Sequence, residues 1–199
     1  MKKTIFAIIF AFFTFTETFA VKYNSDPKIF IEELVNDAIK TLSDKSINKQ
    51  DKAKIIEKIA LENVDIYALG LYTLGDIRKS LDKSVLDKYN KLFESYFLKS
   101  LTSRLTEYSQ SKFEMIGADQ KNAKYTIVNS KIVENTNQPE IKIDWRVYTK
   151  DPLKPLIRDL IVEGLSLAKT QKEEFSSILN SNNSNIDILF SKLEEFISN

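Results

Sequence analysis

The sequence predicts an α+β fold in which an antiparallel sheet of four strands is packed with helices that precede and follow it. Two observations predict this. Apolar residues recur at helical spacing over about 27–108 and again over 167–196, whereas over 113–163 they alternate with polar residues. Helices and strands that are segregated along the chain are typical of α+β domains.

The helices before the sheet are expected from caps and apolar spacing. Asp26 and Pro27 form an N-cap followed by a proline at the first helical position. A second helix is predicted at about 48–61, and a short apolar segment, capped from its N-terminal side, at 66–74. The strongest pattern runs over 84–108, where aromatic and aliphatic residues are spaced by three and four.

The strands follow where the period of the pattern changes to two. They are expected at about 113–117, 124–133, 141–148 and 156–163, with a polar turn at 134–139. The third is the clearest, because four apolar side chains would face one way: Ile141, Ile143, Trp145 and Val147. Gly164 is expected to end the fourth strand, and two further helices at about 167–179 and 186–196 complete the chain.

Residues 1–20 have the pattern of a secretory signal peptide. Two lysines at the start precede an apolar run of 11 residues at 5–15 and a small-x-small ending at Ala20. A membrane-spanning helix needs about 20 apolar residues, so this run is too short for one, although a retained anchor is the alternative interpretation. We expect cleavage after Ala20, export, and a single mature domain over 21–199.

Composition excludes several classes of function. The 199 residues include no His and no Cys, which excludes a Ser-His-Asp triad, a cysteine nucleophile and metal sites built on imidazole or thiolate. The expected signal peptide takes two basic and one acidic residue from 29 and 28, so the mature chain carries 27 of each. A neutral chain lacks the electrostatic footprint of a nucleic-acid-binding protein, and we expect no such partner.

Carboxylate chemistry is the remaining enzymatic possibility. Asp144, Asp159 and Glu163 lie on or at the end of predicted strands. A glycosidase-like acid/base pair needs two carboxyl groups about 5–9.5 Å apart, and no spacing in the sequence brings two of these together. The ordinary interpretation is that they are turn residues or belong to a solvated face.

The apolar surplus of the long helix and of the third strand has two interpretations. The ordinary one is a packed core. The functional one is a hollow core, because a curved sheet under long helices can leave a deep apolar cavity for a ligand. The periodicity of the sequence is the same for both.

Two segments near the end of the sheet resemble the MlaC (toluene-tolerance) family of periplasmic phospholipid-binding proteins. They are residues 143–146, Ile-Asp-Trp-Arg, and 158–167, Arg-Asp-Leu-Ile-Val-Glu-Gly-Leu-Ser-Leu. The family has an aromatic residue eight or nine positions after the Ser, which Phe175 matches, and Asn185-Ile186-Asp187 resembles its Gly-Ile-Asp. Residues 64–70 resemble a further family segment, and Arg158 stands where a Tyr is usual.

The resemblance implies an NTF2-like or cystatin-like sheet and helices around a deep apolar pocket, and thus one phospholipid-binding domain over 21–199. The protein would be a monomeric carrier of a glycerophospholipid in the periplasm, with no cofactor and no catalytic residue. Its partners would be an outer-membrane lipoprotein complex and an inner-membrane ABC transporter with an MCE-domain ring, and its role the maintenance of outer-membrane lipid asymmetry.

We expect the pocket to be lined by the long helix and the apolar face of the sheet. The predicted lipid-binding residues are Tyr72, Phe93, Phe97, Leu101, Tyr108, Ile127, Ile143, Trp145, Val147, Leu160 and Val162. Two other functions stay open: a secreted NTF2-like enzyme that uses carboxylates, and an interaction module with a filled core that bridges envelope proteins.

Overall fold

The computed structural model describes residues 23–105, 112–133 and 140–199, and its fold is the predicted α+β class with helices at both ends. The helices are α1 (Pro27–Ser43), α2 (Lys49–Asn63), α3 (Ile66–Thr73), the 3₁₀ helix η1 (Gly75–Lys79), α4 (Lys83–Leu105), α5 (Leu167–Asn180) and α6 (Ile186–Ser198). The strands are β1 (Lys112–Asn122), β2 (Tyr125–Val133), β3 (Ile141–Tyr148), β4 (Leu156–Val162) and β5 (Leu165–Ser166). The polar turn predicted at 134–139 lies outside the described residues.

The sheet has the order β1-β2-β3-β4-β5, and neighbouring strands are antiparallel. β1 continues past Gly117, its predicted end, to Asn122, which pairs with Tyr125. The residues of β1 from Ala118 onward are exposed, so no apolar alternation marks this half of the strand in the sequence. β1 is extended by its backbone pairing with β2, and the pattern of apolar residues in the sequence gives no sign of this pairing.

A tight turn joins β4 to β5. Glu163 and Gly164 both have positive φ, 49° and 81°, as the two central residues of a type I′ hairpin turn do. Glycine adopts this conformation without steric cost, so Gly164 ends β4 as predicted. The same turn adds the two-residue strand β5, which the sequence did not predict.

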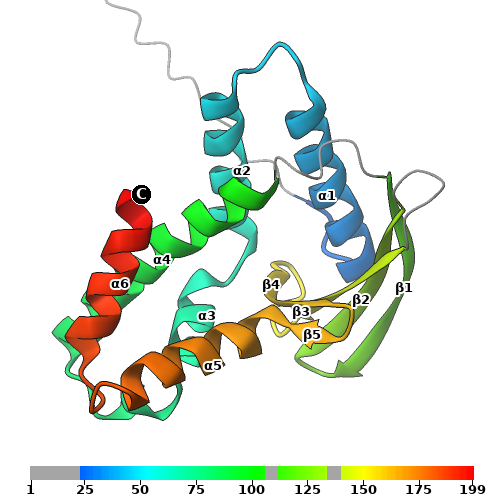
Figure 1. The fold of residues 1–199 in the computed structure, drawn as a ribbon. Helices are drawn as coiled ribbons and strands as arrows, with labels where there is room; N and C mark the ends of the chain where they lie inside the picture. The colour runs from blue at the N-terminus through cyan, green and yellow to red at the C-terminus, as the bar shows by residue number, and fades with distance from the viewer. Residues whose placement is uncertain (1–22, 106–111, 134–139) are drawn as a thin grey trace, which may run out of the picture.

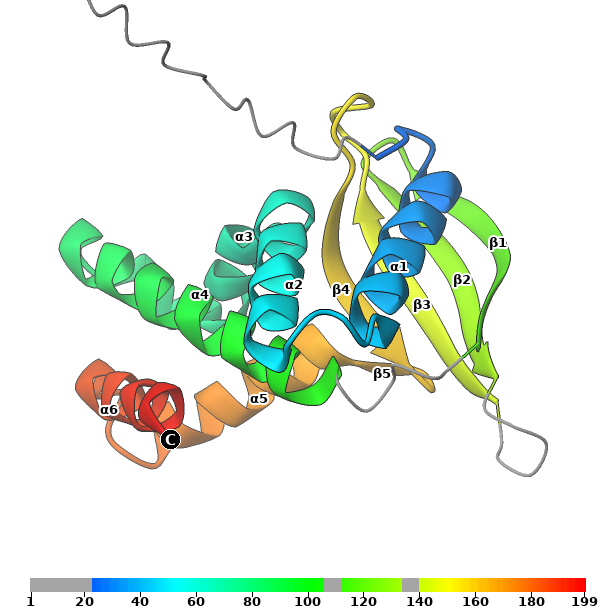
Figure 2. The ribbon, with the colours of Figure 1, turned by 90° about the horizontal axis from the view of Figure 1, so that it is seen from above.

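The apolar core is divided into two clusters. The helical core consists of Ile66, Leu74, Tyr89, Phe93, Phe175, Leu179, Leu189, Phe190 and Leu193 from α3 to α6. The sheet core consists of Phe30, Ile31, Leu34 and Val35 of α1 with Val128, Val147 and Ile157 of the sheet. Val64 packs against both. Figures 1 and 2 show the corresponding halves of the molecule, with α2 between them.

The start of α3 is attached to β4 by backbone and side-chain contacts. The Asp65 N–H donates to the Ile157 carbonyl at 2.9 Å. The Oδ2 of Asp65 accepts from Nε of Arg158 at 2.8 Å and lies 2.7 Å from Nη2. Arg158 also donates to the Tyr125 hydroxyl at 3.0 Å and lies over the Tyr148 ring, 3.5 Å from its centroid. Arg158 therefore connects the two halves.

The start of α5 is attached to the same strand by Asp159. This side chain is buried, and its carboxylate accepts from the Ser166 hydroxyl at 2.7 Å and from the Ala168 N–H at 3.0 Å. Ser166 in turn accepts from the Lys169 N–H and is the N-cap of α5, as predicted. An Nη1 of Arg146 lies 3.7 Å from the Asp159 carboxylate. Asp159 thus orients α5 against the sheet.

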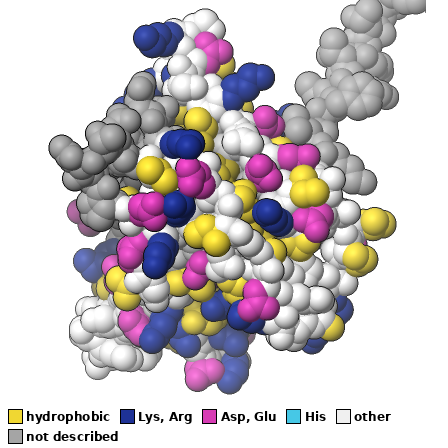
Figure 3. Space-filling model, turned by 90° about the vertical axis from the view of Figure 1, so that its right-hand side faces the viewer, with side chains coloured by type: hydrophobic (Ala, Val, Ile, Leu, Met, Phe, Trp, Pro, Cys, Tyr) yellow, Lys and Arg dark blue, Asp and Glu magenta, His cyan; other side chains and the backbone are white. Residues whose placement is uncertain are grey.

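The surface on the side of the sheet carries charges of both signs. In Figure 3 hydrophobic side chains are scattered singly among Lys, Arg, Asp and Glu, as on most protein surfaces. Within the ranges that the structure describes, no helix is long and apolar enough to cross a membrane.

Replacing Asp159 by Asn is expected to lower the free energy of unfolding by about 1–3 kcal/mol, because one of the two buried donors loses its acceptor. Urea unfolding of the purified protein measures this as a lower midpoint at unchanged slope. Asp87→Asn is the control, since Asp87 is exposed on α4, and it should change stability by less than about 0.5 kcal/mol. Equal midpoints for both variants would contradict the role of Asp159.

A double-mutant cycle tests the contact between Asp65 and Arg158. With Asp65→Asn and Arg158→Gln, we expect a coupling energy of about 0.5–3 kcal/mol, because both side chains are largely buried. The exposed pair Asp51–Lys54, treated in the same way, should give about 0.2–0.5 kcal/mol. Additive effects of Asp65 and Arg158 on the unfolding free energy would show that they do not join the halves.

Candidate functional site

The long helix α4 presents aromatic residues to the helical core at intervals of four. Phe93 is buried, stacks on Tyr89 with centroids 5.8 Å apart, and meets Phe175 edge-on at 6.3 Å. Phe97 is half-buried and packs against the same core. Leu101, one turn further, is also half-buried. The predicted residues of α4 therefore run from the packed core toward the C-terminal end of the helix.

One face of the sheet is covered by α1, and the register determines which residues lie on it. Val128 pairs with Trp145, which pairs with Leu160, so these three side chains share the covered face. Ile127 pairs with Arg146 and lies on the opposite face, away from the other predicted residues. The alternation of β2 is thus shifted by one residue from the expected one.

A buried serine explains that shift. Ser130 lies on the covered face and is 1% exposed. Its hydroxyl donates to the Ile143 carbonyl and accepts from the Trp145 indole N–H, both at 2.9 Å. Because its hydrogen bonds are satisfied, Ser130 can occupy a core position although it is polar. A pattern that counts only apolar residues assigns such a serine to the solvent-exposed face.

Half-buried apolar side chains lie on the covered face beside the sheet core. We call them the apolar strip: Phe113, Met115, Ile132, Ile141, Trp145, Leu160 and Val162. Trp145, Leu160 and Val162 are predicted site residues. Ile143 and Val147 lie on the same face but are buried. Phe113, Met115, Ile132 and Ile141 were not among the predicted site residues, and the place of the first three on this face follows from the pairing of β1 with β2.

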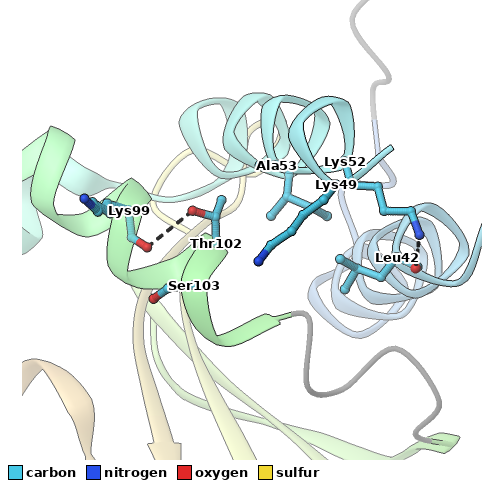
Figure 4. A pocket seen from close by; sticks show the side chains of 8 residues that line it. Leu42, Lys49, Lys52, Ala53, Lys99, Thr102 and Ser103 are labelled. Atoms are coloured by element: carbon cyan, nitrogen blue, oxygen red, sulfur yellow. Dashed lines mark hydrogen bonds between the residues drawn. The ribbon is translucent and has the colours of Figure 1, made fainter. Parts of the chain in front are cut away.

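A hollow of about 190 Å³ lies between α1, α2 and the C-terminal part of α4 (Figure 4). It is lined by Leu42, Lys49, Lys52, Ala53, Ile56, Lys99, Thr102 and Ser103. A larger hollow of about 400 Å³ lies between α1 and α2, but half of its lining residues are charged: Asp37, Lys40, Asp44, Lys58 and Glu62. The smaller hollow is the better match for an apolar ligand.

The hollow and the apolar strip lie at the same end of the molecule. Figures 1 and 2 place the C-terminal ends of α1 and α4 near the start of β1. The chain between Leu105 and Lys112 spans at most about 25 Å, so the end of α4 and the start of β1 can be no further apart than this. Tyr108, another predicted site residue, belongs to this connection and lies outside the described residues. We take the apolar strip and the hollow together as the candidate site.

Tyr72 is not brought to this site. It is 43% exposed on α3, and the Nζ of Lys172 from α5 lies 5.2 Å from its ring centroid. Its position in an apolar segment of the sequence does not distinguish the two sides of the short helix α3.

The candidate carboxylates each have a structural partner. Asp144 accepts from the Asn129 amide at 2.8 Å, Asp159 holds the start of α5, and Glu163 accepts from the Lys142 N–H. Among the residues described, no group of three acidic side chains is placed to hold a metal ion. These contacts account for the three carboxylates through the fold.

Comparison with known proteins agrees with the resemblance in the sequence. The model of the family described as MlaC protein matches residues 32–195, whereas no curated protein matches the chain. A phospholipid-binding protein from Ralstonia solanacearum, solved in complex with a phospholipid, has the same fold with a TM-score of 0.71 and 18% identity over 84% of this chain and 94% of that chain. Because the family match extends over most of its length, the chain belongs to the MlaC family.

Proposed function

We propose that the protein binds a glycerophospholipid, with its acyl chains between the apolar strip of the sheet and the helices α1, α2 and α4. The observation that carries this proposal is the half-buried apolar strip beside a core that is divided into two clusters. Trp145 and Leu160 pack against the sheet core but stay half-buried, so they leave apolar surface that a bound acyl chain would cover.

The size of an acyl chain explains why such a surface is needed. Exposing a methylene group to water costs about 0.8 kcal/mol, so two chains of about 16 carbons cost on the order of 25 kcal/mol. A carrier therefore has to enclose both chains. The apolar strip and the apolar side chains Leu42, Ala53 and Ile56 of the hollow offer surface for this purpose.

Binding of both chains requires the hollow to widen. Its volume of about 190 Å³ is below the ~300–1,000 Å³ that binding sites for small molecules provide. The halves are attached through Asp65 and Asp159 at β4, whereas the apolar strip and the hollow lie at the end where β1 begins. We infer that α1, α2 and the end of α4 move away from one another when a lipid enters.

The proposed role is that of a carrier rather than an enzyme. The signal-peptide pattern of residues 1–20 supports export and cleavage after Ala20, and residues 21–199 would form one phospholipid-binding domain in the periplasm. The domain would act as a monomer that moves lipid between an outer-membrane lipoprotein complex and an inner-membrane MCE-domain ABC transporter. This exchange would maintain the lipid asymmetry of the outer membrane. The membership in the MlaC family supports this role.

The experiment is native mass spectrometry of the protein purified after export, followed by lipid extraction. We expect an adduct of phospholipid mass that is lost on denaturation. Val162→Asp should reduce its occupancy at least about tenfold, because a carboxylate on the apolar strip is poorly solvated beside an acyl chain. Ile161→Asp is the matched control. Ile161 is the half-buried neighbour of Val162 on β4, but its side chain points to the other face, so this substitution should leave lipid occupancy unchanged.

Thermal unfolding of both variants checks that they remain folded. A wild-type protein that carries no lipid and takes none up from vesicles would overturn the carrier function and favour the interaction module. Equal loss of lipid in the two folded variants would retain the carrier function but place its site elsewhere.

A further inference from the structure

The hollow beside α4 has an unusual charge for this protein. The chain as a whole is almost neutral, with 29 basic and 28 acidic residues. The lining of the hollow contains Lys49, Lys52 and Lys99 and no carboxylate. Three cations thus surround an apolar floor made by Leu42, Ala53 and Ile56, an arrangement that is complementary to an anionic amphiphile.

Two of these lysines also have structural roles. The Nζ of Lys52 donates to the Leu42 carbonyl at 2.6 Å, and that of Lys99 donates to the Ile197 carbonyl at 2.7 Å. Each therefore supports the C-terminal turn of a helix, α1 or α6. Their charges contribute to the potential in the hollow, but their ammonium groups are already engaged.

Lys49 has no such partner. Within the described ranges it makes no hydrogen bond or ion pair, and Figure 4 shows its side chain extending into the space between α2, α1 and α4. Lys49 is the first residue of α2, where the helix dipole disfavours a positive charge, so helix stability does not account for it. The flanking carboxylate of Asp51 is engaged with Asn48 and Lys54.

We propose that Lys49 contacts the phosphate of a bound phospholipid and that the three lysines disfavour the ammonium group of a zwitterionic headgroup, so that the carrier prefers anionic headgroups. This inference rests on the proposed function and names the lipid class that the site selects. The acyl chain nearest the headgroup lies on Leu42, Ala53 and Ile56, and the phosphate lies at Lys49. The occupant is a lipid headgroup, since the apolar floor has no role for a free phosphate ion.

The size of the expected headgroup preference follows from the solvent exposure of the contact between Lys49 and the lipid. Exposed ion pairs contribute about 0.2–1 kcal/mol, which corresponds to a preference of up to about fivefold per contact. Salt should weaken it, because the Debye length falls from about 8 Å at physiological ionic strength to about 3 Å at 1 M. We therefore expect about two- to fivefold enrichment of an anionic over a zwitterionic lipid at low salt.

The test is a competition between two lipids with identical acyl chains. The protein purified after export is incubated with vesicles of equimolar phosphatidylglycerol and phosphatidylethanolamine and re-isolated, and the bound lipids are quantified by mass spectrometry. Lys49→Gln should bring the ratio close to that of the vesicles, and Lys49→Arg should retain the preference. Lys91→Gln is the matched control, because Lys91 is exposed on α4 outside the lining of the hollow.

The outcomes separate the two proposals. Binding of no lipid by the wild type overturns the carrier function. Binding of both lipids in the vesicle ratio, or an equal change in Lys49→Gln and Lys91→Gln, overturns only the headgroup preference. Inorganic phosphate should act no more strongly than sodium chloride of equal ionic strength. If it removes the preference specifically, the site binds free phosphate and the assignment to a lipid headgroup is overturned.

Discussion

The helical half of the protein is attached to the sheet through two consecutive residues of β4. Arg158 binds Asp65 at the start of α3, and Asp159 binds Ser166 and the Ala168 N–H at the start of α5. A register shift of β4 at Arg158 places both side chains on the face opposite α1, where Arg158 lies over Tyr148 and Asp159 faces Arg146. The orientation of the helical core relative to the sheet, and with it the position of α4, depends on these two side chains.

At the end of the sheet where β1 begins, the described residues bury the covered face only in part. α1 packs over Val128, Val147 and Ile157, while the apolar strip beside them stays half-buried. The helical core is closed by its own aromatic contacts around Phe93. Because the apolar residues are divided into two clusters, the apolar strip lies beside the sheet core and outside the helical core, where its surface stays partly accessible.

Much of the fold and part of the candidate site could be predicted from local signals. The caps at Asp26 and Ser166 and the turn at Gly164 follow from side-chain and backbone chemistry within a few residues. Trp145 and Leu160 were placed correctly on one face of the sheet, since alternation is strong in β3. Ile127 was placed on the wrong face because Ser130 is buried through two hydrogen bonds with residues of β3, and no local pattern reports such partners.

The sequence by itself determined the order of helices and strands, the ends of most of them and the membership in the MlaC family, because these depend on propensity, periodicity and motifs that are short in sequence. Only the tertiary structure decided that Tyr72 lies on the exposed side of α3, that Phe113 and Ile132 join Trp145 on one apolar surface, and that Lys49 extends into the hollow beside α4. Each of these depends on strand register or helix packing between residues far apart in the chain, where the free energy of contact is gained only once the whole fold has formed.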